Sequence, residues 1–378
     1  MEWANTFVGL WLLFAPLVFW VPSAAIYAND TLIGALAITF AVLVPMMPGM
    51  SMEGMMDPSA IPPGWSYSPS TWAQRMPIIA MGVIGFLIAR YLAAYQLGHV
   101  NSVWDPFFSG KDALNGTETI ITSDVSKAWP IPDGGLGAVA YMLEILMAAM
   151  GGRNRWRTMP WMVTFFGILV VPLGVVSIYF IIKPIVIETW CSLCLVAGLA
   201  MVIMILFALD ELVAMGQFLA WSHRAGKPFW RTFLMGDAMP GGRPDDTDDL
   251  RSVPAAIADA MRGVTVPWTL AASAAIGLML MFTRVLFGTV PPLANSDHLV
   301  GALIITVAAI ATAEVARPIR FLNALFGAWL IVAPWLLGGG GTVASWAGVG
   351  AGLALIGLTL PRGRRSEEHY AGWDRFVV

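Results

Sequence analysis

The residues of this sequence best suited to chemistry are its two cysteines, Cys191 and Cys194; it contains no others. They head an apolar run that continues to about Leu209. At positions i and i+3 on the first turn of a helix, their sulfur atoms lie on one face, close enough to form a small disulfide. The free N–H groups and the dipole of that helix end favour a thiolate. The pair therefore predicts a redox-active dithiol.

The same spacing also suits a packing role, because small residues at i and i+3 let membrane helices approach closely. The two residues alone leave this alternative open. A four-ligand zinc site is not expected, because no second cysteine pair or histidine cluster lies near them in the sequence. The four histidines are scattered, and we predict no metal site.

The elements that must position the cysteines are membrane helices. The 378 residues are 58% hydrophobic and 12% charged, with a mean hydropathy of +0.73, well outside the range of ordinary soluble domains. No basic arm or patch suggests nucleic acid as a partner. Apolar stretches of the roughly 20 residues that a bilayer requires predict an all-α, polytopic fold of about ten transmembrane helices. They lie near 5–26, 31–49, 76–97, 136–150, 159–182, 191–209, 267–287, 297–316, 319–337 and 342–360.

Basic residues predict the orientation of these spans. Most fall in connections on one side: Arg75; Arg153, Arg155 and Arg157; Arg224 to Arg262; Arg317 and Arg320; and Arg362 to Arg375. Only Lys111, Lys127 and Lys183 lie in loops on the other side. By the positive-inside rule, both termini are cytoplasmic and Cys191 lies at the outer surface. Disulfides persist in that compartment, which agrees with a redox role.

A helical hairpin pattern occurs twice. Asn5, Gly9, Trp11, Pro16 and Gly34 recur as Asn323, Gly327, Trp329, Pro334 and Gly352, each 318 positions later. Two copies at one spacing indicate an internal repeat, and the pattern resembles the SPW-repeat hairpin of bacterial membrane proteins. A weaker echo around residues 294–303 suggests a third copy. None of these residues is an acid, base or nucleophile, so we interpret the hairpins as scaffold or assembly surfaces.

Six methionines lie between Met46 and Met56. Clustered thioethers suit Cu(I), which prefers soft ligands. However, no cysteine or histidine accompanies them, and the expected topology places them across the membrane from the cysteines. We therefore favour an adaptable apolar segment at the membrane surface over copper handling.

Two charged residues fall inside predicted spans, Arg90 in 76–97 and Glu144 in 136–150. At a rise of about 1.5 Å per residue they come to similar depths in the bilayer. Isolated charges are costly there, so we predict that they pair. A proton path through Glu144 is the functional alternative.

The loop 98–135 is long for a connection between spans and is a candidate functional cap. It ends in Ser126-x-x-Trp129, the next span begins with Gly137-x-x-x-Tyr141, and Cys191-x-x-Cys194 heads a later span. These motifs, in this order over about residues 76–215, resemble vitamin K epoxide reductase and its bacterial homologues.

The resemblance implies a central four-helix bundle that holds a quinone, ubiquinone or menaquinone, beside the dithiol. It implies that Cys194 faces the quinone, that Cys191 exchanges disulfides with a partner, and that Tyr141 lines the quinone pocket. Ser126 and Trp129 would form part of the cap over the quinone. Family members commonly carry a second cysteine pair in the outer loop, whereas residues 98–135 have none. A periplasmic thioredoxin-like protein or a small thiol would therefore react with Cys191 directly.

These observations predict six segments: an SPW-type hairpin (1–50), a Met/Pro-rich linker (51–75), a vitamin K epoxide reductase-like four-helix domain (76–221), a cytoplasmic linker (222–265), four further spans including a second SPW hairpin (266–360, with the hairpin at 319–360) and a cytoplasmic tail (361–378). Within the cytoplasmic linker we expect a flexible acidic stretch, 240–249, and a short helix, 253–261.

The predicted function is a thiol–quinone oxidoreductase of the bacterial inner membrane, with lipid, a membrane quinone and a periplasmic thiol as partners. The alternative is a non-catalytic membrane scaffold or complex subunit that retains the bundle and assembles through its SPW hairpins.

Overall fold

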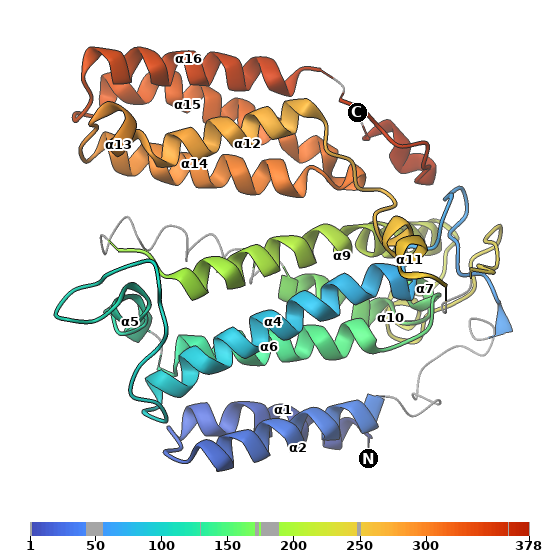
Figure 1. Cartoon of the computed structure of the whole chain (residues 1–378). Coiled ribbons are helices and arrows are strands. Elements are labelled where there is room, and N and C mark those ends of the chain that lie inside the picture. The colour runs from blue at the N-terminus through green and yellow to red at the C-terminus, as the bar shows by residue number, and fades with distance from the viewer. Residues whose placement is uncertain are drawn as a thin grey trace. The chain divides into compact units, whose positions relative to one another are not determined.

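The computed structural model describes residues 2–42, 56–128, 130–170, 174, 189–247, 251–361 and 363–377. The predicted methionine segment, apart from Met56, and Trp129 lie outside these residues, as does most of the end of the predicted span 159–182. Throughout the described ranges the regular secondary structure is helical, with only isolated β-bridges beside it. The chain divides near Met261 into two compact units, each described here by itself (Figure 1).

The first unit is built on α4, which packs along both α6 and α9, while α1 packs along α2 (Figure 1). Its helices are α1 (Glu2–Val18), α2 (Ala24–Val42), α4 (Trp72–Gln96), α5 (Gly116–Ile121), η1 (Ser126–Ala128), α6 (Asp133–Ala149), α7 (Arg155–Thr158), the helix Pro160–Val170, α9 (Ser192–Arg224), α10 (Phe229–Met235) and α11 (Val253–Ala260). The short helix predicted at 253–261 is thus present as α11.

Six helices in the described ranges are long and apolar enough to cross a membrane: Ala24–Ala41, Trp72–Gln96, Ser192–Arg224, Leu293–Ile310, Glu314–Leu336 and Thr342–Thr359. The apolar helices Trp3–Val18, Pro160–Val170 and Trp268–Met281 are shorter. Together they make the protein an all-helical, multi-pass membrane protein, as predicted. Each of the ten predicted spans contains a helix, although the length criterion alone selects six.

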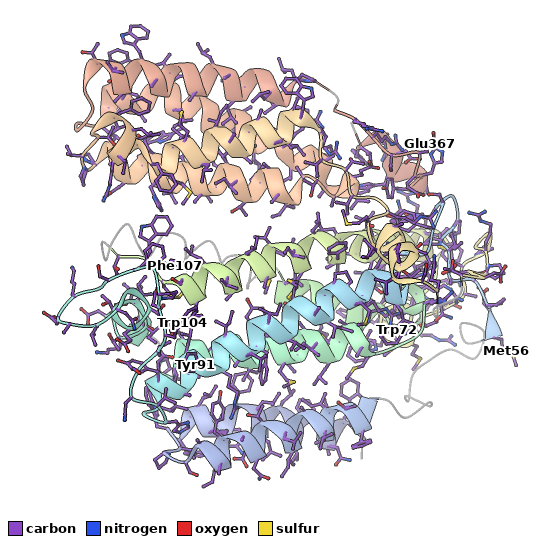
Figure 2. All side chains as sticks on the ribbon, in the orientation of Figure 1. Met56, Trp72, Tyr91, Trp104, Phe107 and Glu367 are labelled. Atoms are coloured by element: carbon purple, nitrogen blue, oxygen red, sulfur yellow. A yellow bond between two sulfur atoms is a disulfide. The ribbon has the colours of Figure 1, made fainter. Side chains whose placement is uncertain are left out.

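Exposed aromatic side chains lie at both ends of α4. Tyr91, Trp104 and Phe107 lie toward one end, and Trp72 lies at the other (Figure 2). Trp104 and Phe107 expose 65% and 78% of their surface, and Trp72 exposes 39%. Tryptophan and tyrosine concentrate where a membrane meets water, since one end of the ring system is apolar and the other polar. The two groups agree with a unit that spans a bilayer along α4.

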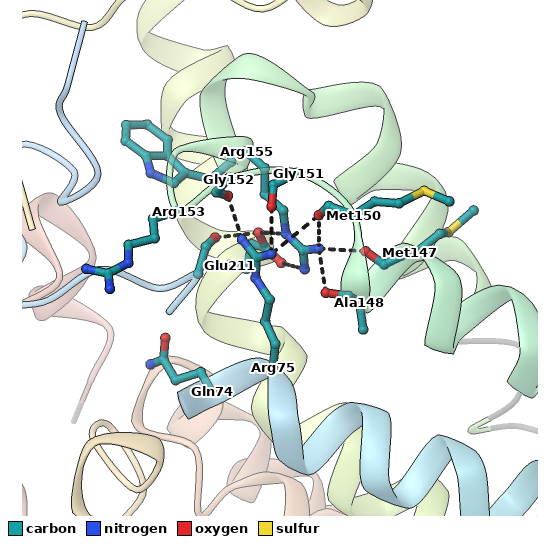
Figure 3. A network of polar contacts seen from close by, with 12 residues as sticks. Gln74, Arg75, Met147, Ala148, Met150, Gly151, Gly152, Arg153, Arg155 and Glu211 are labelled. Atoms are coloured by element: carbon teal, nitrogen blue, oxygen red, sulfur yellow. Dashed lines mark hydrogen bonds and ion pairs between the residues drawn. The ribbon is translucent and has the colours of Figure 1, made fainter. Parts of the chain in front are cut away.

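Two buried arginines close the end of the first unit that holds the turn 151–154. Nε and Nη2 of Arg155 each donate to an oxygen of Glu211 at 2.5 Å, and its Nη1 donates to the last carbonyls of α6 (Figure 3). Arg75 donates to the carbonyls of Gly151 at 2.8 Å and Gly152 at 2.5 Å. The last four carbonyls of a helix lack partners inside it. Arginine donors therefore satisfy groups that the end of α6 would otherwise bury without hydrogen bonds.

The predicted pair of Arg90 and Glu144 is wrong. The guanidinium of Arg90 lies 3.9 Å from the ring centroid of Tyr27, and its Nη1 donates to Thr31 Oγ1 at 3.0 Å. Both partners come from α2. Glu144 is fully buried in α6, and neither carboxylate oxygen has a hydrogen-bond partner in the described part of the chain. The two residues also lie at different levels, because Ala89 on α4 lies beside Gly137 on α6, whereas Gly82 lies beside Ile145. Arg90 points toward α2.

The stretch predicted as a flexible acidic linker has specific contacts as far as residue 247. Arg243 forms a β-bridge with Ile61, and Arg153 donates to the carbonyls of Asp245 at 2.9 Å and Thr247 at 2.5 Å. The arginines of the turn 151–158, which the sequence analysis used to orient the spans, also need hydrogen-bond acceptors for their guanidinium groups. Asp245 and Thr247 supply them for Arg153, which thereby fixes the path of this part of the stretch.

The second unit contains four long apolar helices, α12 (Trp268–Met281), α14 (Leu293–Ile310), α15 (Leu322–Leu336) and α16 (Thr342–Thr359). Between and after them lie α13 (Thr283–Phe287), η2 (Glu314–Phe321) and η3 (Ala371–Arg375). Their core consists of Leu280, Val300, Ile304, Leu330 and Leu355, which come from all four long helices. Apolar faces of two consecutive hairpins therefore pack on one another.

Three hairpins share one helix crossing. A Cβ atom added to Gly9 would lie 2.7 Å from the carbonyl oxygen of Gly34, and one added to Gly327 would lie 2.7 Å from that of Gly352. The same holds at Gly277, 2.6 Å from the carbonyl oxygen of Gly301. Only glycine permits such close approach of two backbones. The hairpin of α12 and α14 is thus a third copy of the crossing made by α1 with α2 and by α15 with α16.

Candidate redox site

The two cysteines lie at the start of α9. Cys191 is the N-cap residue in an extended conformation, and its Sγ accepts a hydrogen bond from the backbone N–H of Cys194 at 3.0 Å. A side-chain acceptor at this position satisfies one of the four N–H groups that a helix leaves unpaired at its start. The residue that caps the start of α9 is thus also the first cysteine of the pair.

Cys191 and Cys194 form a disulfide, with their Cα atoms 5.2 Å apart. Each exposes only 1% of its surface. The spacing therefore produces the bonded pair expected from it, while the catalytic role of the two residues stays a prediction.

The loop that precedes α6 covers this pair. Trp190 stacks on Phe108 with ring centroids 5.9 Å apart, and Thr189 Oγ1 donates to the carbonyl of Ser109 at 2.7 Å. Gly116, the first residue of α5, lies so close to the carbonyl of Trp190 that a Cβ atom has no room. These contacts fix the two residues that directly precede Cys191, which is itself buried.

Asp105, in the same loop, binds the first turn of α9. Its carboxylate accepts from Ser192 N at 3.2 Å and Ser192 Oγ at 2.5 Å. It also accepts from Thr117 N at 3.0 Å and Thr117 Oγ1 at 2.7 Å, and from the N–H groups of Phe107 and Phe108, each at 3.2 Å. One side chain therefore joins the loop, α5 and the cysteine-bearing helix.

These bonds keep Asp105 ionised. Desolvation by burial raises the pKa of a carboxyl group, but hydrogen bonds from Ser192 and Thr117 outweigh it and hold the pKa of Asp105 below its ordinary value. At neutral pH the start of α9 therefore faces a negative charge.

Tyr141 lies on α6, facing α4 and α9. Its hydroxyl donates to the carbonyl of Ala197 at 2.9 Å, one helical turn below Cys194. Its ring lies against the bare backbone of Gly85 on α4, where a Cβ atom would overlap it. The glycine thus leaves room for the ring between two helices, one turn of α9 away from Cys194.

Ser126 is buried beside the start of α6. Gln96, at the end of α4, donates through Nε2 to Ser126 Oγ at 3.1 Å and to Asp133 Oδ1 at 2.6 Å, and its Oε1 accepts from Gly134 N at 3.0 Å. Asp133 precedes Tyr141 by about 12 Å of helix rise. The structure therefore places the Tyr141 hydroxyl on the turn of α9 that follows Cys194, and it holds Ser126 beside the start of α6. Trp129 lies outside the described residues.

Asp105 and Gln96 organise the site, and the sequence motifs did not identify either. Asp105 precedes a proline in a polar loop, which is also the usual signal for a turn. A stronger signal was Ser192 between the cysteines, because a hydroxyl there invites an acceptor from the loop. In the described ranges, no cluster of three or more His, Cys, Asp or Glu side chains suits a metal ion.

Comparison with known proteins identifies two segments of the chain. Residues 76–209 match the Vitamin K epoxide reductase family, and residues 267–361 match the SPW repeat domain. The SPW match includes α12 and α14, the third copy suggested by the sequence, but not the hairpin at 1–50. No curated protein and no solved structure matches the chain. The chain thus contains a segment that matches the Vitamin K epoxide reductase family, followed by a segment that matches the SPW repeat domain.

Proposed function

We propose that this protein is a membrane thiol–quinone oxidoreductase in which Cys191 and Cys194 react. A domain of the Vitamin K epoxide reductase family implies thiol–disulfide chemistry in a membrane, and quinones are the electron acceptors of that family. The observation that carries the proposal is the disulfide on the first turn of α9, inside the matched segment. An apolar electron acceptor dissolved in the bilayer suits a pair that is buried in a multi-pass protein.

The reaction has two balanced halves. In one, the Cys191–Cys194 disulfide takes two electrons and two protons from thiols, which leave as a new disulfide. In the other, the two S–H bonds break, the intramolecular S–S bond re-forms, and a quinone accepts both electrons and both protons to become a quinol. The protein needs no further redox group for either half.

Each residue of the site has a role in this scheme. The N–H of Cys194, which already contacts Cys191 Sγ at 3.0 Å, stabilises a thiolate at Cys191 when the bond is open. Cys194 faces the acceptor, and Tyr141 lines the pocket with its ring and supplies a hydroxyl near Ala197. Ser126 and Trp129 belong to the cap of that pocket. Ser126 Oγ accepts from Gln96, which leaves its own proton available for a carbonyl oxygen.

We extend the proposal to the architecture. Helices α4, α6, Pro160–Val170 and α9 form a four-helix bundle within a domain at 76–221, flanked by hairpins at 1–50 and 266–360. About ten helices span a bacterial inner membrane. Both termini are cytoplasmic and the cysteines lie at the periplasmic side, as the distribution of arginine supports.

The physiological reductant is a thiol from outside the chain. Residues 98–135 contain no cysteine that could relay electrons, and this loop covers Cys191. A small thiol, or a thioredoxin-like protein that displaces the loop, fits these constraints. A small thiol needs a smaller displacement of the loop than a thioredoxin-like protein does.

The test measures the redox state of the pair in membranes. Membranes are reduced, the reductant is removed, a quinone is added, and free thiols are tagged with a mass-labelled maleimide. The expected result is a quinone-dependent loss of two tags. Cys194→Ser must abolish thiol-dependent quinone reduction, and a matched Ser109→Ala variant in the covering loop must retain it. Thiols that stay reduced with every quinone, in folded protein, would overturn the proposal.

A second candidate function is a non-catalytic membrane scaffold. The observation that favours it is the SPW repeat domain, whose glycine crossings contain no reactive group. In that case both cysteines tolerate replacement by serine, whereas changes at Trp329, whose Nε1 donates to Ser296 Oγ at 2.9 Å, disrupt assembly. Co-purification of membrane partners with each variant distinguishes the two functions.

A further inference from the structure

Asp105 lies against the first turn of α9, and we propose that its negative charge sets the reduction potential of the Cys191–Cys194 pair. The inference rests on the proposed thiol–disulfide function. Asp105 acts through the cysteines and the helix start, so it is a positioning residue for the reaction.

The first turn of α9 has backbone N–H groups with no partner inside the helix. Cys191 Sγ accepts from Cys194 N at 3.0 Å, and Asp105 accepts from Ser192 N at 3.2 Å. Both acceptors therefore use the same helix terminus, within a single turn. When the disulfide opens, a thiolate at Cys191 carries a full negative charge at this terminus, where the carboxylate already lies.

The two redox states respond differently to that carboxylate. The disulfide is neutral, so Asp105 affects its free energy little. A thiolate within the same helical turn is repelled by the carboxylate, and Asp105 has already taken one of the N–H donors that would stabilise it. The reduced state is therefore disfavoured. Asp105 makes the pair a better electron donor, the direction that quinone reduction requires.

The bonds of Asp105 to Thr117, Phe107 and Phe108 hold the charge in place. They come from the covering loop and α5, so the carboxylate cannot swing into solvent without breaking the loop's own structure. The lowered pKa of Asp105 agrees with a carboxylate that stays charged while the pair reacts.

The same loop offers a matched control in Glu118. This buried carboxylate accepts from Val103 N at 2.9 Å and Asn115 N at 3.1 Å, and it forms the capping box of α5. It holds the loop through backbone N–H groups as Asp105 does, but its bonds stay inside the loop. Glu118→Gln therefore loosens the loop without removing charge from the start of α9.

The experiment titrates the purified full-length protein in detergent against mixtures of reduced and oxidised dithiothreitol, with maleimide tagging as the readout. Asp105→Asn is expected to shift the dithiol–disulfide equilibrium about tenfold toward the reduced form, a potential about 30 mV more oxidising. Asp105→Ser, a second charge-removing variant, is expected to shift it in the same direction. Asp105→Glu keeps the charge and is expected to stay near wild type, as is Glu118→Gln.

The outcomes separate this inference from the function on which it rests. If the wild-type pair titrates reversibly but both charge-removing variants match it, the role of Asp105 is overturned and the thiol–disulfide function stands. An equal shift in Glu118→Gln also overturns it, because loosening of the loop then accounts for the effect. A wild-type pair that does not titrate overturns both proposals.

Discussion

Glu144 offers the sharpest test of how the first unit is built. Its side chain is fully buried in α6, and its two carboxylate oxygens have no hydrogen-bond partner among the residues that the structure describes. A buried polar group left without a partner costs about 1–3 kcal/mol. Methionine is of similar length, flexible and free of groups that need strong hydrogen bonds. We therefore expect Glu144→Met to raise the free energy of unfolding by about 1–3 kcal/mol.

A matched control comes from another buried glutamate of the same unit. Glu211 exposes 3% of its surface, and each of its oxygens accepts from Arg155 at 2.5 Å. Removing one partner of a buried ion pair costs about 3–5 kcal/mol, because the remaining charge is left uncompensated. The same replacement, Glu211→Met, should therefore destabilise the protein. Two glutamates in one unit thus predict changes of opposite sign.

The assay is unfolding of the purified protein in mixed micelles with increasing dodecyl sulfate, followed by tryptophan fluorescence and checked by thermal denaturation. A loss of more than about 1 kcal/mol in Glu144→Met, an ordinary value for a point substitution, would refute the reasoning. Quinone reduction by the same variant separates the two roles considered for Glu144. Retained turnover with raised stability means that the carboxyl is dispensable, whereas lost turnover with raised stability means that it carries protons.

Three further predictions follow from single contacts. Tyr141→Phe removes the bond to the Ala197 carbonyl, so stability falls by about 1 kcal/mol while maleimide tagging still detects disulfide formation. Gly116→Ala adds a Cβ atom that pushes α5 away from the Trp190 carbonyl, at a cost of about 1–3 kcal/mol. Because this loosens the loop over Cys191, we expect reduced Cys191 to be alkylated about tenfold faster or more. Gly327→Ala forces apart α15 and α16 and lowers stability by about 1–3 kcal/mol, whereas Gly357→Ala, which points into open space, is neutral by the same unfolding assay.

The disulfide was predictable because it depends on spacing within one helix. Cysteines at i and i+3 reach each other in any regular first turn, so their bond needs no knowledge of the remaining fold. The contact of Tyr141 with the Ala197 carbonyl and the ring's seat on Gly85 depend instead on how α6 and α4 are placed. Motif order suggested that Tyr141 lies near the cysteines, but no periodicity could supply these contacts.

Directions around a helix were the information that the sequence lacked. Helix rise within each predicted span gave Arg90 and Glu144 similar depths, yet it says nothing of the offset or the rotation of one helix against the other, and Ala89 lies beside Gly137 instead. Arg90 turned toward Tyr27 and Thr31 because α2 offers both an aromatic face and a hydroxyl beside α4. A helical hairpin far away in sequence thus satisfied a charge that had been assigned to the neighbouring span. Asp105 was missed for a related reason, since its partner Ser192 lies 87 positions away.

The hairpin repeat shows the opposite case, in which geometry persists after the pattern fades. The paired glycines are 25 positions apart in the hairpins of Gly9 and of Gly327, but 24 apart in that of Gly277. A comparison at one fixed offset therefore matches the first two and loses register in the third. The crossing itself requires only that both backbones lack a Cβ atom where they touch, a condition that Gly277 and Gly301 meet. The residues around that contact and the length of the loop are free to vary. The third copy is therefore hard to detect in the sequence, although its helices cross in the same way as those of the other two hairpins.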